Sequence, residues 1–259
     1  MRYWFVGWDP RDDLASRVAI RSMARTGATD VRVVFLRDHE LRRTGLYWRS
    51  YEVRENGQMI DNGDGKPFST AFSFSRFIVP ELARQMGIHD PVLFSDPDIM
   101  LRANINEVFD LWDDSHSVMC VQHDHTPKEA TKFDGIQQTK YFRKNWSSVM
   151  LIHPDKTKSL TPQKVNNQTG AQLHALLWAG ADDNIGALPS EWNHLVGYSE
   201  PNPNAKLVHF TLGDPSVPGR ENDEHADEWR SYLEADEIQH LPQGNFDRSQ
   251  HTWKQRGGL

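Results

Sequence analysis

Two aspartates spaced two residues apart are the side chains of this sequence best suited to metal chemistry. Asp96 and Asp98 follow the short apolar run PVLF, which has the composition of a buried strand. Because side chains in extended backbone repeat every two residues, both carboxylates point to the same side of the chain. Paired carboxylate oxygens suit Mn²⁺ or Mg²⁺, ions that also bind the phosphates of nucleotides. The same Asp-Pro-Asp sequence is equally typical of a solvated turn after a buried strand.

The elements that must position these aspartates alternate along the first half of the chain. Apolar runs at Tyr3–Val6 and Val31–Leu36 predict strands, and the apolar residues between Leu14 and Met23 recur at helical spacing. A third predicted strand leads into Asp96. This alternation of strands and helices is typical of an α/β sheet with crossover helices.

Composition narrows the class of protein. The chain of 259 residues can bury a substantial core, and its mean hydropathy of −0.68 is that of a polar globular protein. The formal charge of −7 argues against broad nucleic-acid binding, which needs a basic surface. No apolar run reaches the roughly eighteen residues of a membrane span, so we expect no transmembrane segment and take a cytoplasmic location as the default.

The order of motifs along the chain resembles glycosyltransferase family 8 and related bacterial enzymes of the GT-A fold. The matching stretches are FVGWDPRD, SFSRFIVPEL, SDPD, NWSSVMLIH, DDNIGALPSEWN and LVHFT. They extend from about residue 3 to residue 219, most of the chain. The resemblance implies one GT-A type α/β domain over residues 1–240, with a Rossmann-like mixed sheet flanked by helices, followed by a polar C-terminal tail at 241–259.

The resemblance also implies roles for individual residues. Asp96, Asp98 and His209 match the metal ligands, so Mn²⁺ or Mg²⁺ is the implied cofactor. The implied donor-binding residues are Trp8, Asp9, Arg11, Arg76, Asp96, Lys144 and Asn145. The implied catalytic residues, beside the donor sugar, are Asp182, Asp183 and Asn184. From the residues alone, Arg76 could instead form a buried structural ion pair. Asp182 and Asp183 could instead cap a helix or turn ahead of a strand.

Two departures from the family pattern affect the phosphate and sugar contacts. After the histidine the family has Gly-x-x-Lys-Pro-Trp, whereas this chain reads GDPSVPG and lacks that lysine. Another cation must then contact the diphosphate, and the candidates are Lys144, Arg143, Arg11 and Arg220. The family's Asp-Gln-Asp is replaced by Asp-Asp-Asn, which leaves open the side chain that faces the reacting carbon of the sugar.

The implied reaction is metal-dependent transfer of a sugar, with retention of configuration, from a nucleotide-diphosphate sugar to an acceptor hydroxyl. A UDP-sugar is the expected donor, and a glycan or lipid-linked glycan is the expected acceptor; a nucleic-acid acceptor is less expected because of the negative charge. A catalytically idle protein of the same fold, binding a nucleotide or glycan, is one alternative. A sugar-1-phosphate nucleotidyltransferase is another, although GWDPRDD lacks the glycine-rich loop of that class.

Overall fold

The computed structural model describes residues 1–55, 57–124, 143–239, 246–247 and 252–253. Its strands are β1 (Arg2–Gly7), β2 (Val31–Leu36), β3 (Tyr51–Val53), β4 (Met59–Asp61), β5 (Pro67–Phe68), β6 (Val92–Ser95), β7 (Ile99–Leu101), β8 (Val118–Cys120), β9 (Val149–Ile152), β10 (Ile185–Ala187), β11 (His194–Leu195), β12 (Leu207–His209), β13 (Phe246–Asp247) and β14 (Thr252–Trp253). Its α-helices are α1 (Asp13–Arg25), α2 (Asp38–Arg43), α3 (Val79–Gln85), α4 (Asn106–Phe109), α5 (Pro162–Asn167), α6 (Gly170–His174), α7 (Ala226–Arg230) and α8 (Ala235–Gln239). Its 3₁₀ helices are η1 (Pro10–Asp12), η2 (Ser75–Ile78), η3 (Trp146–Ser148), η4 (Pro154–Thr157), η5 (Leu177–Ala179), η6 (Asp182–Asn184) and η7 (Ser190–Asn193).

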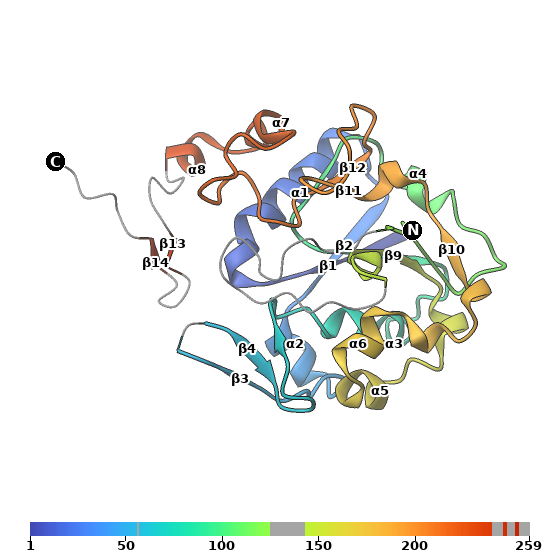
Figure 1. The fold of residues 1–259 in the computed structure, drawn as a ribbon. Helices are drawn as coiled ribbons and strands as arrows, with labels where there is room; N and C mark the ends of the chain where they lie inside the picture. Colours follow the sequence, from blue (N-terminus) through green and yellow to red (C-terminus); the bar gives the residue numbers. More distant parts are fainter. Residues whose placement is uncertain (56, 125–142, 240–245, 248–251, 254–259) are drawn as a thin grey trace.

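A six-stranded mixed sheet lies at the centre of the fold (Figure 1). Its strand order is β10-β8-β9-β6-β1-β2. β1 pairs in parallel with β2 and β6, and β8 pairs in parallel with β10. β9 runs antiparallel to both β6 and β8. The predicted α/β fold with a mixed sheet flanked by helices is therefore confirmed.

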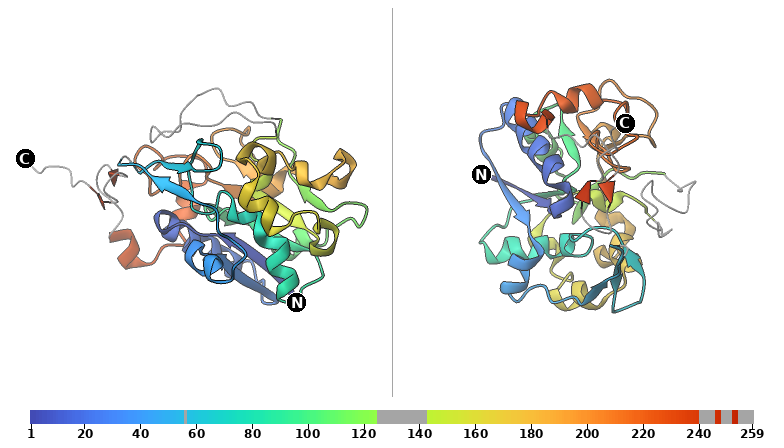
Figure 2. Two further views of the ribbon diagram at one scale, coloured as in Figure 1. Left: turned by 90° about the horizontal axis from the view of Figure 1, so that it is seen from below. Right: turned by 90° about the vertical axis from the view of Figure 1, so that its left-hand side faces the viewer.

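Helices cover both faces of this sheet, with α1 and α3 on opposite sides (Figures 1 and 2). The alternation of β1 explains why both faces are apolar. Trp4 packs in the hydrophobic cluster that includes Ala19 of α1, whereas Phe5 packs in the cluster that includes Val79 of α3. Both β1 side chains are fully buried, so the strand is enclosed between two helical layers.

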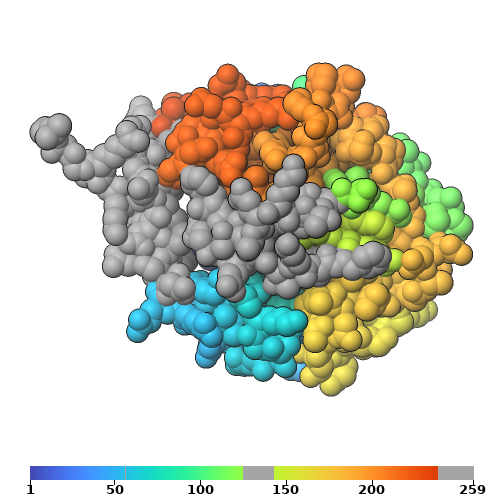
Figure 3. Space-filling model, viewed as in Figure 1, coloured from blue at the N-terminus to red at the C-terminus, as the bar shows by residue number. Residues whose placement is uncertain are grey.

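Two smaller sheets flank the central one. β11, β12 and β7 form a three-stranded sheet in which β12 runs antiparallel to β7. β3, β4 and β5 form an antiparallel meander, where the sequence predicts a loop or hairpin insertion. In the space-filling view the segment around this meander, in cyan, lies low on the face, and the orange to red segment after β11 lies above it (Figure 3).

Local sequence explains several element boundaries. Pro80 lies in the first turn of α3, where its missing N–H costs no hydrogen bond, and η2 leads directly into that turn. Thr169 begins α6 with a capping box, because its side chain accepts from the N–H of Gln172 while the Gln172 side chain accepts from the N–H of Thr169. These short helices fix the segments that border the site.

Most of the predicted tail lies outside the described residues. Of residues 241–259 only the paired strands β13 and β14 are described. In the described part of the chain, no helix has the length and apolar character needed to cross a bilayer.

Candidate active site

The aspartate pair lies where the central sheet passes into the second sheet. β6 ends at Ser95 and β7 begins at Ile99, so Asp96 and Asp98 occupy the connection between them. Backbone hydrogen bonds hold both ends: the N–H of Asp96 donates to the carbonyl of Ser148 (2.8 Å), and the carbonyl of Asp98 accepts from the N–H of Phe210 (2.9 Å). The turn predicted as an alternative is thus anchored to two other segments.

Strand pairing brings His209 beside this pair. β12 runs antiparallel to β7 with His209 opposite Ile99, the residue after Asp98. Nε2 of His209 lies 3.3 Å from Oδ1 of Asp98, and its side chain is only 1% exposed. One ligand atom from each of Asp96, Asp98 and His209 falls in a group whose members all lie within 4.8 Å of one another. The structure therefore brings together the three residues that the sequence suggests as metal ligands.

A hydrogen-bond chain defines the tautomer of His209. Ser148 Oγ donates to the carbonyl of Asn145 (2.7 Å), so it accepts from Nδ2 of Asn193 (3.0 Å). The remaining side-chain atom of Asn193, Oδ1, then accepts from Nδ1 of His209 (3.0 Å). The proton of the neutral imidazole is thereby placed on Nδ1, and Nε2 presents its lone pair toward the aspartates.

These residues fit a divalent cation. Within the described part of the chain Nε2 of His209 is buried and has no hydrogen-bond partner, although an oxygen of Asp98 lies 3.3 Å away. A lone pair facing a carboxylate oxygen is repulsive unless a cation lies between them. Two ligands of one octahedral ion at about 2.1 Å are roughly 3.0 Å apart, close to this spacing. Two carboxylates and one imidazole suit Mn²⁺ or Mg²⁺.

Arg76 supports the pair from inside the protein. Its Nη1 lies 2.8 Å from Oδ1 of Asp96 and donates to the carbonyl of Ser147 (2.9 Å). The Arg76 side chain is 6% exposed, so this ion pair is buried. Oγ of Ser147 in turn bonds Nδ1 of His174 (2.7 Å). Burial, followed by the charges of Arg76 and Lys144, lowers the pKa of His174 well below its usual range, so this imidazole is neutral.

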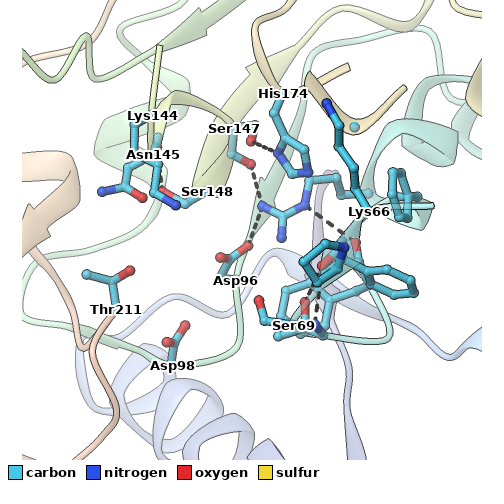
Figure 4. Close-up of a pocket in the computed structure, with 18 of the residues that line it drawn as sticks. Lys66, Ser69, Asp96, Asp98, Lys144, Asn145, Ser147, Ser148, His174 and Thr211 are labelled. Carbon is cyan, nitrogen blue, oxygen red and sulfur yellow. Dashed lines mark hydrogen bonds and ion pairs between the residues drawn. The ribbon is translucent and has the colours of Figure 1, made fainter. Parts of the chain in front are cut away.

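A pocket with a volume of about 150 Å³ opens beside Asp96 and Asp98. This is room for several water molecules or for part of a polar ligand. In Figure 4, Asp96 and Asp98 lie near the middle, with Lys144 and Asn145 on one side and Lys66 on the other. Carboxylates and ammonium groups thus surround one space.

Among the residues that the structure describes, Lys144 and Lys66 are the lysines that line this pocket. Lys144 is one of the cations that the sequence offers in place of the missing phosphate lysine. Lys66 lies between β4 and β5. It was not predicted from sequence because it reaches the pocket only through the packing of the meander. Asn145, the residue directly after Lys144, has a left-handed backbone (φ 66°) that Asn tolerates better than most residues.

Arg143 and Arg220 have other contacts. Arg143 donates from Nη2 to Oδ1 of Asp182 (2.5 Å) and from Nη1 to the carbonyl of Ala175 (2.9 Å). Nη1 of Arg220 donates to Asp223 (3.3 Å). Neither arginine lines the pocket.

In the first loop, two of the implied donor-binding residues pair with each other. Asp9 and Arg11 form a buried ion pair (2.6 Å), and Asp9 also accepts from the N–H of Ala71 (3.0 Å). Burial raises the pKa of Asp9, but the hydrogen bond and charge of Arg11 outweigh it and leave the pKa below its usual range. Trp8 is half-buried with Arg37 5.3 Å from its ring, and none of Trp8, Asp9 and Arg11 lines the pocket.

Asp12, in the same loop, is a pocket residue that the sequence analysis did not single out. Burial, then the carboxylates of Asp9 and Asp98, raise its pKa well above the usual range. It therefore adds a third acidic group on the side of Asp98. The sequence signal was available in the run WDPRDD, where the resemblance implied donor-binding roles only for Trp8, Asp9 and Arg11.

The implied catalytic residues Asp182, Asp183 and Asn184 lie next to the edge strand β10, at the opposite end of the sheet from Asp96. β10 is parallel to β8, and β9 is antiparallel to both β8 and β6, so β10 points in the same direction as β6. The Asp182–Asn184 helix precedes the start of β10, whereas Asp96 follows the end of β6. Both aspartates are exposed, and none of the three residues lines the pocket. The structure does not bring them to Asp96.

No protein-family model matches the chain. Solved structures with similar folds include the bifunctional glycosyltransferase WbbM (TM-score 0.59, 12% identity, 89% of this chain and 49% of that one). Glycosyltransferase GlyE of Streptococcus pneumoniae TIGR4 has a TM-score of 0.57 at 14% identity, over 92% of this chain and 61% of that one. An active-site mutant of LgtC has a TM-score of 0.55 at 10% identity, over 92% and 99%.

This chain thus spans about half the length of the WbbM structure and 61% of the GlyE structure. At these identities the likeness shows the fold, which is that of GT-A type glycosyltransferases, as the sequence resemblance implied. A curated relative, Protein CDI of Arabidopsis thaliana, is 43% identical over 238 residues that cover 89% of this chain and 85% of that protein. The chain therefore belongs to the same family as Protein CDI and has the GT-A fold.

Proposed function

We propose that this protein is a metal-dependent glycosyltransferase that moves a sugar from a nucleotide-diphosphate sugar to an acceptor hydroxyl. The observation that carries the proposal is the lone pair of His209 facing Asp98 at the mouth of a pocket that also contains lysines. The GT-A fold supports it, since the similar structures are glycosyltransferases. A UDP-sugar donor and a glycan or lipid-linked acceptor are the simplest form of the proposal.

In this proposal Asp96, Asp98 and His209 hold Mn²⁺ or Mg²⁺. Such an ion, when bound, neutralises charge on the leaving diphosphate and acts as a Lewis acid. Lys66 and Lys144 supply further positive charge for the phosphates, taking the place of the missing family lysine. Asn193 keeps the lone pair of His209 on Nε2, and Arg76 fixes the orientation of Asp96.

Retention of configuration is part of the proposal, but we assign no step to Asp182, Asp183 or Asn184, because they lie away from the pocket. Trp8, Asp9 and Arg11 are proposed to shape the loop beside the donor. Nuclear magnetic resonance of the anomeric proton of the first product tests the stereochemistry. An inverted product would remove retention from the proposal and leave sugar transfer standing.

The decisive experiment has two stages. First, thermal unfolding is followed with a panel of nucleoside diphosphates and nucleotide-sugars, each with and without Mn²⁺, because a ligand that binds only the folded state raises the melting temperature. Second, release of nucleoside diphosphate from the stabilising sugar donor is measured by chromatography. We expect stabilisation and turnover that both require the metal.

The test variant is Asp98→Asn, which removes a ligand charge with little change in shape. It should fold normally and lose metal-dependent turnover. Asp113→Asn, an exposed aspartate outside the pocket, is the matched control and should behave as wild type. Normal turnover by Asp98→Asn would refute the metal site.

One observation favours a second candidate function, a non-catalytic protein that binds a nucleotide or glycan. Arg76 already neutralises Asp96 within the protein, so the pocket could hold an anionic ligand with no metal. In that case a nucleoside diphosphate would stabilise the protein equally with and without Mn²⁺, and no donor would be turned over.

A further inference from the structure

A second group of metal-ligand side chains lies outside the pocket. His194, the first residue of β11, faces Glu224 and His225, which directly precede α7. One ligand atom from each falls within 4.8 Å of the others. The side chains are 2%, 27% and 10% exposed, respectively, so both imidazoles are at least nine-tenths buried. None of the three lines the pocket at Asp96.

One of the short contacts in this group is not a hydrogen bond. Nε2 of His194 and Oε2 of Glu224 are 2.9 Å apart, a distance that fits either a shared proton or two ligands of one ion. Nε2 of His225 lies 3.2 Å from the other oxygen of Glu224, yet this buried nitrogen has no hydrogen-bond partner within the described residues. His209 and Asp98 show the same combination of a short distance and no hydrogen bond.

A transition-metal ion would satisfy both contacts at once. Ligands about 2.0–2.1 Å from a tetrahedral ion are roughly 3.3 Å apart, which matches the 3.2 Å between His225 and Glu224. Two imidazoles and one carboxylate are a donor set of Zn²⁺ sites, with water in the fourth position. Mg²⁺ and Ca²⁺ prefer oxygen ligands, so this set favours the softer ion.

Surrounding groups hold the three side chains in place. Oε1 of Glu224 accepts from the N–H of Asn202 (3.2 Å). Nδ1 of His225 faces Glu228 at 3.7 Å, and Arg102 donates to Glu228 (2.9 Å). A carboxylate behind the second ring nitrogen is the arrangement that orients histidine ligands in metal proteins.

The backbone of His225 agrees with this role. Its φ of 63° is left-handed, an uncommon conformation for a residue with a side chain. Its ring centre lies 5.9 Å from that of His194.

We propose that His194, Glu224 and His225 form a binding site for Zn²⁺ or a similar transition-metal ion. The site ties the α7 segment to β11. Because Asn193 directly precedes His194 and bonds His209, the ion also stabilises the wall beside the pocket. This inference does not depend on sugar transfer, since it concerns a different set of ligands.

Zinc stoichiometry tests the proposal on the full chain. Protein stripped with a chelator is reloaded with Zn²⁺, dialysed, and analysed by mass spectrometry of its metal content. The Asp98→Asn background removes binding at the pocket. In that background we expect one equivalent of Zn²⁺. Adding Glu224→Gln or His225→Gln should weaken the zinc affinity about 100-fold or more, so we expect no zinc to remain after dialysis.

His89→Gln is the matched control, because it removes an exposed histidine that pairs only with Asp155 in the described contacts. It should retain one equivalent in the same background. Circular dichroism checks that the variants fold. If both site variants unfold, Co²⁺ is bound to the Asp98→Asn protein instead, and its visible absorption spectrum reports the coordination of the ion. Tetrahedral d–d bands support the site. Their absence, or full zinc binding by folded Glu224→Gln and His225→Gln proteins, overturns it.

Discussion

At the scale of single residues, the tautomer of His209 is the feature with the largest chemical effect. Asn193 fixes it by accepting from Nδ1, and Asn193 is itself oriented by Ser148. Loss of such a group behind a metal ligand typically weakens metal affinity about 10- to 100-fold. The proposed metal site therefore depends on a residue outside its set of ligands.

We expect Asn193→Ala to weaken Mn²⁺ binding about 10- to 100-fold, because Nδ1 loses its acceptor and the imidazole can change tautomer. Electron paramagnetic resonance of free Mn²⁺ measures the affinity. Asn166→Ala is the control, since Asn166 is also buried but bonds Leu46 and Trp48. Equal affinities in the two variants would contradict the tautomer argument.

A second residue-scale prediction concerns His174. Its pKa is lowered in the folded protein by burial and by Arg76 and Lys144, so below about pH 6.5 the unfolded chain takes up a proton that the folded chain does not. Stability from this group is complete above pH 6.5 and falls as the pH drops, by up to about 1.4 kcal/mol for each pH unit. Urea unfolding at pH 7.5 and 5.5 should show a larger loss for wild type than for His174→Gln. Equal losses would argue against a neutral buried His174.

The site residues were predictable from sequence only where local pattern carries the information. Asp96 and Asp98 follow an apolar strand, and His209 ends another, so their exit points could be inferred. Lys66 could not be found this way, because it reaches the pocket through the meander rather than through any spacing near Asp96. Asn193 was part of a recognised stretch, but its bond to His209 requires the pairing of β11 with β12.

At the scale of elements, the positions of strands along the sequence were easier to predict than their pairing and direction in the sheet. β1, β2 and β6 are short apolar runs bounded by polar residues, and the structure has strands at those positions. The placement of Asp182–Asn184 depends on the direction of β10, which follows from its pairing with β8 on the far side of β9. No local sequence pattern predicts the direction of β10, so the separation of Asp182–Asn184 from Asp96 was not predictable.

The contact between α8 and α1 gives a prediction of the same sign as that for His174, but over a lower range of pH. The hydrogen bond from Arg21 lowers the pKa of Glu237 to about 2, against the effect of burial, and Glu234 and Arg17 add to the lowering. The stabilisation is therefore present above pH 4.5 and is lost as the pH falls toward 2. Limited proteolysis near α8 should increase over that range.

Glu237→Gln should show the faster cleavage already at neutral pH, because it lacks the charge that Arg21 and Arg17 bind. Asp227→Asn in α7 is the control, since that side chain is fully exposed and pairs with Arg230. If the protease cuts wild type and Glu237→Gln at the same rate at pH 7, the ion pair does not hold α8 in place.

At the scale of the whole molecule, the pocket is assembled from segments that extend from Asp12 to Thr211. Each wall comes from a different part of the chain, so a bound donor would connect the meander, the central sheet and the second sheet. A ligand that binds only this assembled state stabilises the complete fold.

Lys66→Gln and Lys144→Gln should each lower the affinity for a nucleoside diphosphate with Mn²⁺ by about 10-fold or more, the effect of losing a charge-assisted hydrogen bond. Isothermal titration calorimetry measures this. Lys158→Gln is the control, because Lys158 is 70% exposed and faces Asp155. Unchanged affinity in both pocket variants would mean that the phosphates bind elsewhere.

The strand order of the central sheet has a consequence for the newly made chain. β6 lies between β1 and β9, and β9 is supplied only by residues 149–152. Until those residues leave the ribosome, the apolar β6 has an open edge that can pair with another nascent chain. Premature termination within this interval therefore yields fragments prone to aggregation. The exposed edge of β6 needs protection by chaperones during synthesis, before the pocket has formed.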